Sequence, residues 1–351
     1  MKKLRHCEEE NKEGEDRLSD LSDCLLLRIL SFLNAKHVVQ TCILSKRYEH
    51  LWKHIPTLIL QASTFATLKQ FSKFVSKILT LRDTSTALLA LDLHRPGISV
   101  CADSALIFPH VSSCQFLTSL KLLVYHRGLY YNNQKTVFPK ALNLPVLTNL
   151  DLTSFAFSSD GNDYAEPFSA FGRLNSLAVR DCTVKDARIL NISSETLVNL
   201  DTPDQQICGS GLSSVKHVNI AADIHFHWEE PPMVLLSWLQ GLANVKSLTF
   251  SSTTLQILSL VPDLPEVKLH SLCNLKSMEI KLAPPQAGYE PPPILDGIVK
   301  FLLQNSPSAK VDITPKYLGA CKLDQEDKSS NEDKAEKHQP NTNSQLLDKG
   351  Q

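Results

Sequence analysis

The feature that most constrains the fold is a short pattern of aliphatic residues that recurs along most of the chain. Each unit has three aliphatic positions, as in Leu88, Leu91 and Leu93, and the units return at intervals of about 18 to 30 residues. One unit cannot bury its own apolar face, so neighbouring units must stack and share a core. The middle positions of the successive units are Leu91, Leu120, Leu150, Leu177, Leu200, Val218, Leu248 and Met278. This pattern predicts a parallel sheet with these residues pointing inward.

The segments between the units have the features of helices and further strands. The stretch 67–79 contains LKQFSKFVSKIL, which has the apolar periodicity of an amphipathic helix. Shorter helices are expected at 254–260 and 294–303, with an opening strand at 58–60 and a closing strand at 309–313. The spacing is typical of leucine-rich repeats. We therefore expect an α/β solenoid, in which a parallel sheet forms an arc with helices or loops on its convex side.

The polar residues between the inward-facing leucines are the candidates for binding a target, because they face solvent on the concave side of the arc. They are Asp92, Lys121, Asp151, Arg180, Asp201, Asn219, Thr249, Glu279 and Lys281. Acids outnumber bases along this strip, which favours a basic segment of a target protein. Charges on a solvated face also serve solubility alone, so both interpretations stay open.

The N-terminal part, from about residue 17 to residue 54, has a different, helical pattern. Ser22 is placed to cap a first helix, with Asp23 in the first turn near the positive end of the helix dipole. Leu21 and Leu26 have the spacing of a hydrophobic staple. One apolar stripe of the helix contains Leu25, Ile29 and Leu33, and Leu26 and Leu30 lie beside it.

Two further short helices are expected in this module. Asn34 is placed to cap the second and Ser45 to cap a third over residues 46–52, and Pro56 ends the helical region. Three short helices in about forty residues cannot bury all of these leucines among themselves. The excess apolar surface must therefore pack on the following domain or on a partner protein.

The segment 16–58, DRLSDLSDCLLLRILSFLNAKHVVQTCILSKRYEHLWKHIPTL, resembles the plant F-box without gaps. The likeness includes the Asp-Arg opening, the Leu-Leu-Leu-x-Ile-Leu-Ser-Phe-Leu run, the Leu-Ser-Lys-Arg tetrapeptide and the later Leu-Trp pair. Two positions depart from the family pattern: Ser22 stands where proline is usual, and Tyr48 where tryptophan is usual. The segment 305–313 also resembles the ends of plant F-box/leucine-rich-repeat proteins.

This resemblance implies that the module docks on a Skp-family adaptor, which in turn binds a cullin scaffold. The residues that it assigns to the adaptor contact are Leu21, Ser22, Leu25, Ile29, Leu30, Leu33, Val39, Ile43, Leu44 and Trp52. Of these, Trp52 and Ile43 also suit a place in the core of the module itself. The implied function is that of the substrate-recognition subunit of a Skp–cullin–F-box ubiquitin ligase, which is not itself an enzyme.

Composition excludes several other classes of protein. The formal net charge is −1, so no basic field attracts nucleic acid or acidic lipid, and no apolar run is long enough for a membrane span. The nine cysteines form no C-x-x-C pair and are odd in number, which favours reduced thiols in the cytoplasm, the nucleus or both. No secretory signal is expected at the N-terminus.

The sequence contains no motif for a catalytic site. Phosphate-binding loops, nucleophile elbows and dinucleotide fingerprints are absent, and His225 and His227 have no cysteine at ligand spacing, so no cofactor or metal is expected. Two alternatives stay open: an interaction scaffold with no ligase role, and a small-molecule sensor. The expected organisation is a flexible tail at 1–15, the F-box module at 16–56, the repeat domain at 57–320 and a disordered tail at 321–351.

Overall fold

The computed structural model describes most of the chain between residues 18 and 315. The described residues are 18, 20–83, 85–96, 104–125, 135–140, 142–159, 161–187, 189–202, 207–208, 212–220, 232–282 and 296–315. The tails expected at 1–15 and 321–351 lie outside these residues. No helix in the described ranges is both long enough and apolar enough to cross a membrane.

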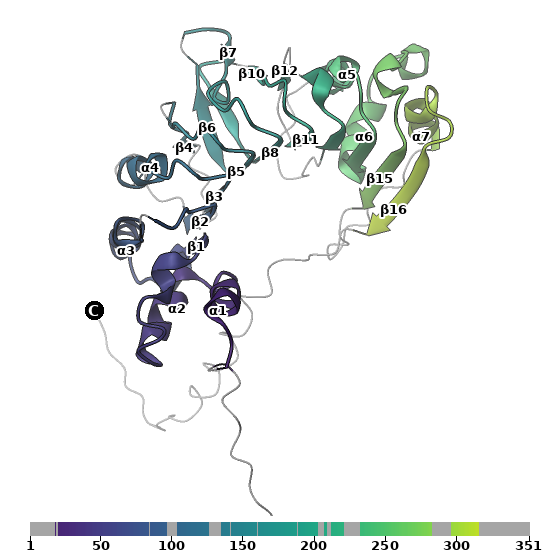
Figure 1. The fold of residues 1–351 in the computed structure, drawn as a ribbon. Helices are drawn as coiled ribbons and strands as arrows, with labels where there is room; N and C mark the ends of the chain where they lie inside the picture. The colour runs from purple at the N-terminus through teal and green to yellow at the C-terminus, as the bar shows by residue number, and fades with distance from the viewer. Residues whose placement is uncertain are drawn as a thin grey trace, which may run out of the picture.

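A curved sheet of ten parallel strands forms the body of the protein, as Figure 1 shows. Its strands pair in the order in which they occur along the chain, each with the next sheet member. The strands are β1 (Thr57–Gln61), β2 (Ala90–Pro96), β3 (Ser119–Tyr125), β5 (Asn149–Thr153), β8 (Ser176–Arg180), β11 (Asn199–Thr202), β13 (His217–Ile220), β14 (Ser247–Ser251), β15 (Ser277–Leu282) and β16 (Lys310–Pro315). The predicted parallel sheet is confirmed, including its opening and closing strands.

The middle aliphatic residues of the repeated pattern align in one row across this sheet and form its core. The register pairs Leu58 with Leu91, Leu91 with Leu120, and so on along the sheet. The row contains Leu58, Leu91, Leu120, Leu150, Leu177, Leu200, Val218, Leu248 and Met278, and each is at most 3% exposed. Because side chains alternate between the two faces of a strand, the residues between these leucines point to the opposite face.

Helices cover the outer side of the curved sheet (Figure 1). They are α3 (Leu68–Leu81), α4 (Ser104–Ser112), α5 (Pro232–Gly241), α6 (Ser252–Ser259) and α7 (Asp296–Leu303). Three of them, α3, α6 and α7, were predicted, and their bounds differ from the predicted ones by at most two residues. In α3 the Thr67 hydroxyl accepts a hydrogen bond from the Gln70 amide, and the helix buries Phe71, Val75 and Ile78 against the core.

Two small sheets, which the repeat pattern did not predict, lie between these helices on the outer side of the arc (Figure 1). They contain β4 (Thr136–Val137), β6 (Phe155–Ser158) and β9 (Thr183–Lys185), and β7 (Tyr164–Ala165), β10 (Ile189–Asn191) and β12 (Ile207–Cys208). Buried aromatic rings fill the space beneath the first: Phe138 lies 6.0 Å from both Phe155 and Phe157. Aromatic packing of this kind replaces a helix as the cover of the sheet here.

The N-terminal module contains α1 (Asp23–Leu30), α2 (Ala35–Gln40) and two short 3-10 turns at Thr41–Ile43 and Leu51–His54. The cap predicted for α2 is confirmed, since the Asn34 side chain accepts a hydrogen bond from the Lys36 amide at 2.9 Å. The prediction for α1 is wrong in one respect: the helix begins after Ser22, but the Ser22 side chain makes no capping hydrogen bond.

The predicted third helix, over residues 46–52, is not present. The chain there makes hydrogen bonds between residues three apart, from the Tyr48 amide to Ser45 and from the Leu51 amide to Tyr48. Such bonds form tight turns rather than an α-helix, and Pro56 follows too closely for a longer helix to develop.

The module packs directly on the first strand of the sheet. Ala35 of α2 is 1% exposed and belongs to the same apolar core as Leu58 and Leu60. Asn34 bridges to Ile59 through the backbone, and its side chain donates a hydrogen bond to Gln61 at 3.1 Å. The helical module and the sheet therefore share a continuous core.

Candidate docking surfaces

The N-terminal module has a concentration of exposed apolar side chains. Seven of the fifteen large apolar residues that are exposed in the described structure lie within residues 18–44. They are Leu18 (54% exposed), Leu25 (50%), Ile29 (45%), Phe32 (72%), Leu33 (41%), Ile43 (87%) and Leu44 (66%). We refer to these seven as the N-terminal apolar surface.

Helix α1 supplies apolar residues to two places at once. Leu26 and Leu30 are 2% and 4% exposed and pack in the core of the module with Val38. Leu25 and Ile29, one position earlier in each case, lie about 100° round the helix and are exposed to solvent. A helix that is apolar over most of its circumference can satisfy only one side within a module of this size, so the other side is left for a partner.

The structure distributes the ten predicted adaptor residues between surface and core. Leu25, Ile29, Leu33, Ile43 and Leu44 are exposed, as is Ser22. Leu21 is half-buried against the core of the module, Val39 against the core of the sheet, and Trp52 against both.

Leu30 is buried in the module's own core, so its assignment to the contact surface requires correction: it supports α1 from beneath. Phe32 and Leu18 were not predicted. Phe32 lies two residues after the end of α1. Its spacing of three from Ile29 and seven from Leu25 continues the apolar stripe, so the sequence did carry a signal for it.

Arg47 fixes the start of α1 and thereby the apolar surface. Its guanidinium Nε and Nη2 donate to the Asp23 carboxylate at 2.9 and 2.7 Å, and Nη2 also donates to the Leu21 carbonyl oxygen. Through these three hydrogen bonds one rigid guanidinium contacts Leu21 and Asp23, the residues on both sides of Ser22. Nearby, Tyr48 is 9% exposed and fills the module core in the position where the family usually has tryptophan.

The polar candidates on the sheet are brought together as one row. The register places Asp92 beside Lys121 and Lys121 beside Asp151, and it continues through Asp201, Asn219 and Thr249 to Glu279. All of these side chains are partly exposed. They face the opposite side of the sheet from the buried leucines, and a shallow groove of about 430 Å³ follows the middle of the row.

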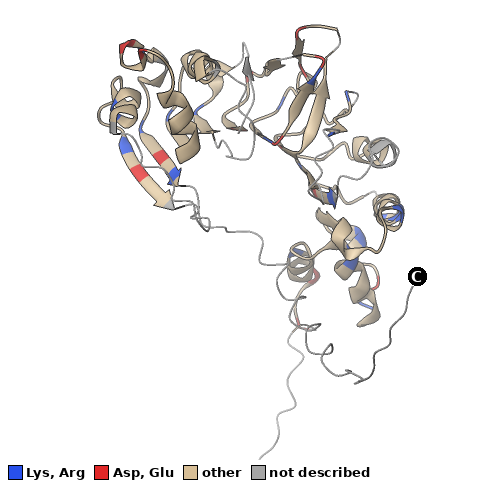
Figure 2. Cartoon of the chain, turned by 180° about the vertical axis from the view of Figure 1, so that it is seen from behind, with Lys and Arg blue, Asp and Glu red and all other residues tan. Residues whose placement is uncertain are grey.

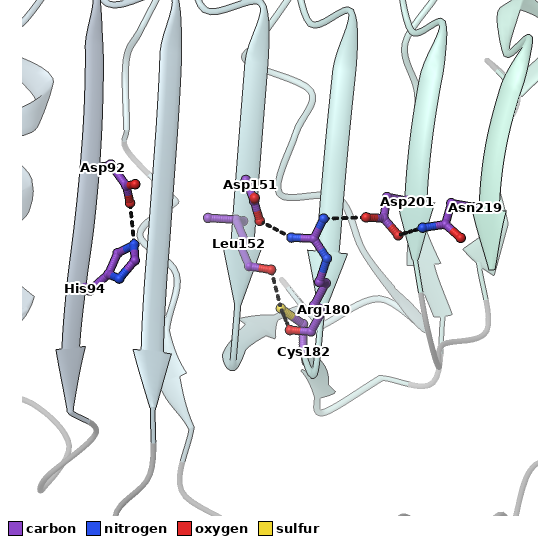
Figure 3. Close-up of polar contacts among 8 residues, drawn as sticks. All are labelled: Asp92, His94, Asp151, Leu152, Arg180, Cys182, Asp201 and Asn219. Carbon is purple, nitrogen blue, oxygen red and sulfur yellow. Dashed lines mark hydrogen bonds and ion pairs between the residues drawn. The ribbon is translucent and has the colours of Figure 1, made fainter. Parts of the chain in front are cut away.

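Arg180 is the centre of a polar network in this row, drawn in Figure 3. Its guanidinium donates to Asp151 at 2.6 Å and to Asp201 on the other side, and the Asn219 amide donates to Asp201 at 2.9 Å. Burial opposes the charge of the guanidinium, but the two flanking carboxylates outweigh burial and raise the pKa of Arg180. The network therefore joins four strands through side chains.

The other two acids in the row, Asp92 and Glu279, also have a basic or polar neighbour. His94 lies 2.6 Å from Asp92, and Lys281 lies 3.6 Å from Glu279, which also accepts a hydrogen bond from Thr314. Figure 2 shows acidic and basic residues scattered along the strands and not gathered in one patch of a single sign. The strip is thus less acidic than its sequence indicated, because Arg180 lies between Asp151 and Asp201 and Lys281 lies beside Glu279.

Within the described residues, no group of three or more His, Cys, Asp or Glu side chains could hold a metal ion. The predicted pair His225 and His227 lies outside those residues. Cys182 is 4% exposed, and this burial raises the pKa of its thiol to about 12, so the thiol stays protonated and unreactive.

Comparison with known proteins identifies the domain family that the N-terminal module matches. Residues 18–60 match the F-box domain family. Three relatives from Arabidopsis thaliana illustrate the likeness: an FBD-associated F-box protein is 49% identical over 69 residues, F-box/LRR-repeat protein 13 is 37% identical over 81, and an F-box/FBD/LRR-repeat protein is 30% identical over 149.

These alignments cover 19, 23 and 41% of this chain and 16, 18 and 34% of the three relatives. The chain therefore matches well under two thirds of their length. With an F-box at residues 18–60, a sheet built on a leucine-spaced pattern, and relatives named as F-box/LRR-repeat proteins, the chain fits the plant F-box/leucine-rich-repeat family.

Proposed function

We propose that this protein is the substrate-recognition subunit of a Skp–cullin–F-box ubiquitin ligase. The observation that supports the proposal most directly is the N-terminal apolar surface, because it lies on a module that matches the F-box. A concentration of exposed leucine, isoleucine and phenylalanine side chains in one small module is costly in water and usually marks a protein interface. Its burial would contribute roughly 25 cal/mol per Å² before the costs of association.

The partner in this proposal is a Skp-family adaptor, which would connect the chain to a cullin scaffold. Leu25, Ile29 and Phe32 would form the centre of the contact, since they are exposed on and directly after one helix whose other side is fixed in the module core. The Arg47–Asp23 ion pair supports the same interpretation because it holds that helix in place before a partner binds.

The second part of the proposal concerns the sheet, which we interpret as a leucine-rich-repeat solenoid. Its concave row would hold a target protein through Asp92, Lys121, Asp151, Arg180, Asp201, Asn219, Thr249, Glu279 and Lys281. Several of these side chains already have partners on the same sheet, so a target would have to compete with them or bind beside them. The groove along the middle strands offers the space for such a contact.

In this scheme the chain has no catalytic residue of its own. The ligase assembly would bring a lysine of the target close to a ubiquitin-charged enzyme, and the acceleration would come from proximity. We propose that this takes place in the cytoplasm, the nucleus or both.

The test is binding of purified Skp-family adaptor to the full chain, measured by calorimetry. The double variant Leu25→Asp, Ile29→Asp introduces two charges into the proposed contact and is expected to weaken binding at least a hundredfold. Leu260→Asp is the matched control, because Leu260 is 69% exposed on the far part of the sheet domain, and it should bind like the wild type.

Circular dichroism and thermal unfolding verify that each variant is folded. Tight adaptor binding by a folded Leu25→Asp, Ile29→Asp variant would move the contact elsewhere on the module. A wild-type chain that does not bind the adaptor would favour a free interaction scaffold instead.

A further inference from the structure

A second surface on the sheet is predominantly basic and has no assigned role. Lys216, Lys246 and Lys276 each stand immediately before a strand, at β13, β14 and β15. The three strands are neighbours in the sheet, and the register aligns the residues that follow the lysines: His217 with Ser247, and Ser247 with Ser277. The lysines are therefore adjacent at the edge of the sheet where these strands begin.

Backbone hydrogen bonds fix this alignment. The Lys246 amide donates to the Lys216 carbonyl oxygen at 2.8 Å, and the Lys276 amide donates to that of Lys246 at 2.9 Å. Adjacent strands lie about 4.8 Å apart, so three successive lysines span roughly 10 Å. Like charges placed opposite each other on neighbouring strands repel, and this arrangement is unfavourable unless an anion offsets it.

The three side chains line one open cavity of about 640 Å³. Among the described residues, no side-chain hydrogen bond or ion pair is made by these lysines, and Glu195 is the single acid in the cavity lining. Polar groups surround the lysines: the Asn274 amide donates to Asn244 at 3.4 Å, and the Asn244 amide donates to the Ser213 carbonyl oxygen at 3.0 Å. The cavity thus has cationic and amide donors with little to neutralise them.

Earlier strands show that the fold does not need lysine at this position. Thr118 and Thr148 precede β3 and β5 in the same way, and each hydroxyl donates to a backbone carbonyl oxygen of the preceding repeat at 3.0 Å. At these positions a threonine hydroxyl is enough to donate a hydrogen bond to the backbone carbonyl oxygen of the neighbouring repeat. Among the described residues, the lysine side chains make no such hydrogen bond, so they add positive charge without stabilising the sheet.

We propose that Lys216, Lys246 and Lys276 form a binding site for an acidic peptide segment of a partner protein, with carboxylate or phosphate groups as the ligands. An extended peptide rises about 3.3 Å per residue, so three or four residues would cover the row. A phosphoserine would supply a charge of about −1.5 to −2 and three acceptor oxygens at one point. The site is separate from the N-terminal apolar surface and does not depend on adaptor binding.

The experiment measures fluorescence anisotropy of labelled peptides with the full chain. One peptide carries a run of four glutamates, a second carries phosphoserine beside one glutamate, and a third replaces all charges with glutamine and serine. We expect the first two to bind and the neutral one not to bind, and we expect binding to weaken as salt rises. The stronger of the two anionic peptides identifies the preferred group.

Two triple variants have the same charge change. Lys216→Gln, Lys246→Gln, Lys276→Gln should weaken peptide binding at least tenfold and leave the melting temperature equal or slightly higher, since repulsion is removed. The matched control changes Lys69, Lys73 and Lys77 to glutamine; these exposed lysines form a row along α3. The control should bind within twofold of the wild type. Equal loss in both variants, or no binding of either anionic peptide by the wild type, would overturn the proposal.

Discussion

Arg180 shows how single residues organise the concave face. It stands between two carboxylates on the neighbouring strands, and all three side chains are partly shielded from water. Removing the guanidinium would leave Asp151 and Asp201 without a cation, and a shielded charge that loses its partner is destabilising. Arg180 therefore stabilises the fold mainly by compensating the charges of Asp151 and Asp201.

We predict that Arg180→Met lowers the free energy of unfolding by about 1 kcal/mol, because methionine keeps the packing of the stem but removes the charge. Denaturant unfolding measures this difference. Adding Asp151→Asn and Asp201→Asn to the variant should recover most of the loss. Lys121→Met is the control, since Lys121 has no ion pair among the described residues, and its effect should stay within about 0.5 kcal/mol. A loss that the two asparagines do not reduce would show that packing, and not charge, is the cause.

Sequence and structure agree on which residues share a face and differ on their partners. The alternation of side chains along a strand is local, so the row from Asp92 to Glu279 was predictable. The bridge from Arg180 to Asp201 was not, because it depends on how the irregular segment between β8 and β11 aligns the two strands. Leu25 and Leu30 pose the same difficulty: both belong to an apolar helix, and only the packing of Tyr48 and Val38 decides which one is buried.

At the scale of elements, the two N-terminal helices begin in different ways. The Asn34 side chain caps α2 and also contacts Gln61, whereas the Ser22 side chain does not cap α1. Ser22 instead has a φ of −65° and, within the described part of the chain, no hydrogen bond from its amide. These are the backbone conditions that proline satisfies.

We predict that Asn34→Ala lowers the free energy of unfolding by about 1–2 kcal/mol through the loss of its cap, while Ser22→Ala changes it by less than about 0.5 kcal/mol. Ser22→Pro should raise it by about 0.4–1 kcal/mol, since proline restricts the unfolded chain at a compatible φ. Thermal unfolding of the three variants checks the order. If Ser22→Ala were as harmful as Asn34→Ala, the serine hydroxyl would have a role that its position in the structure does not indicate.

Element boundaries were predictable where a single strong period set them. The apolar stripe of α3 and the leucine spacing of the sheet strands each repeat over many residues, so small errors average out. The third helix of the N-terminal module failed because seven residues ending near a proline carry too little signal to separate an α-helix from successive turns. The two small sheets on the outer side of the arc were not predicted for another reason. Their strands have only two to four residues and form through contacts between segments far apart in the sequence.

For the whole molecule, the decisive feature is the core that the N-terminal module shares with the sheet. In a sheet whose strands pair in chain order, each strand contacts mainly its neighbours, so a local defect should spread to adjacent strands and fade with distance. Here the first neighbour of β1 on one side is β2, and on the other side it is the module itself, through Ala35 and Val39. The orientation of the apolar surface relative to the arc is thus fixed by packing.

Amide hydrogen exchange tests this coupling. Leu60→Ala removes a side chain that is 1% exposed in β1, and we predict faster exchange both in β2 and in α2, because each packs on the cavity that the substitution creates. Leu258→Ala, at a fully buried position of α6, is the matched control and should affect β14 and β15 while leaving α2 unchanged. If Leu60→Ala left exchange in α2 at the wild-type rate, the module would open independently of the sheet. In that case the proposed ligase subunit would present its target through a hinge, and the distance between adaptor and target would be set by mobility and not by the shared core.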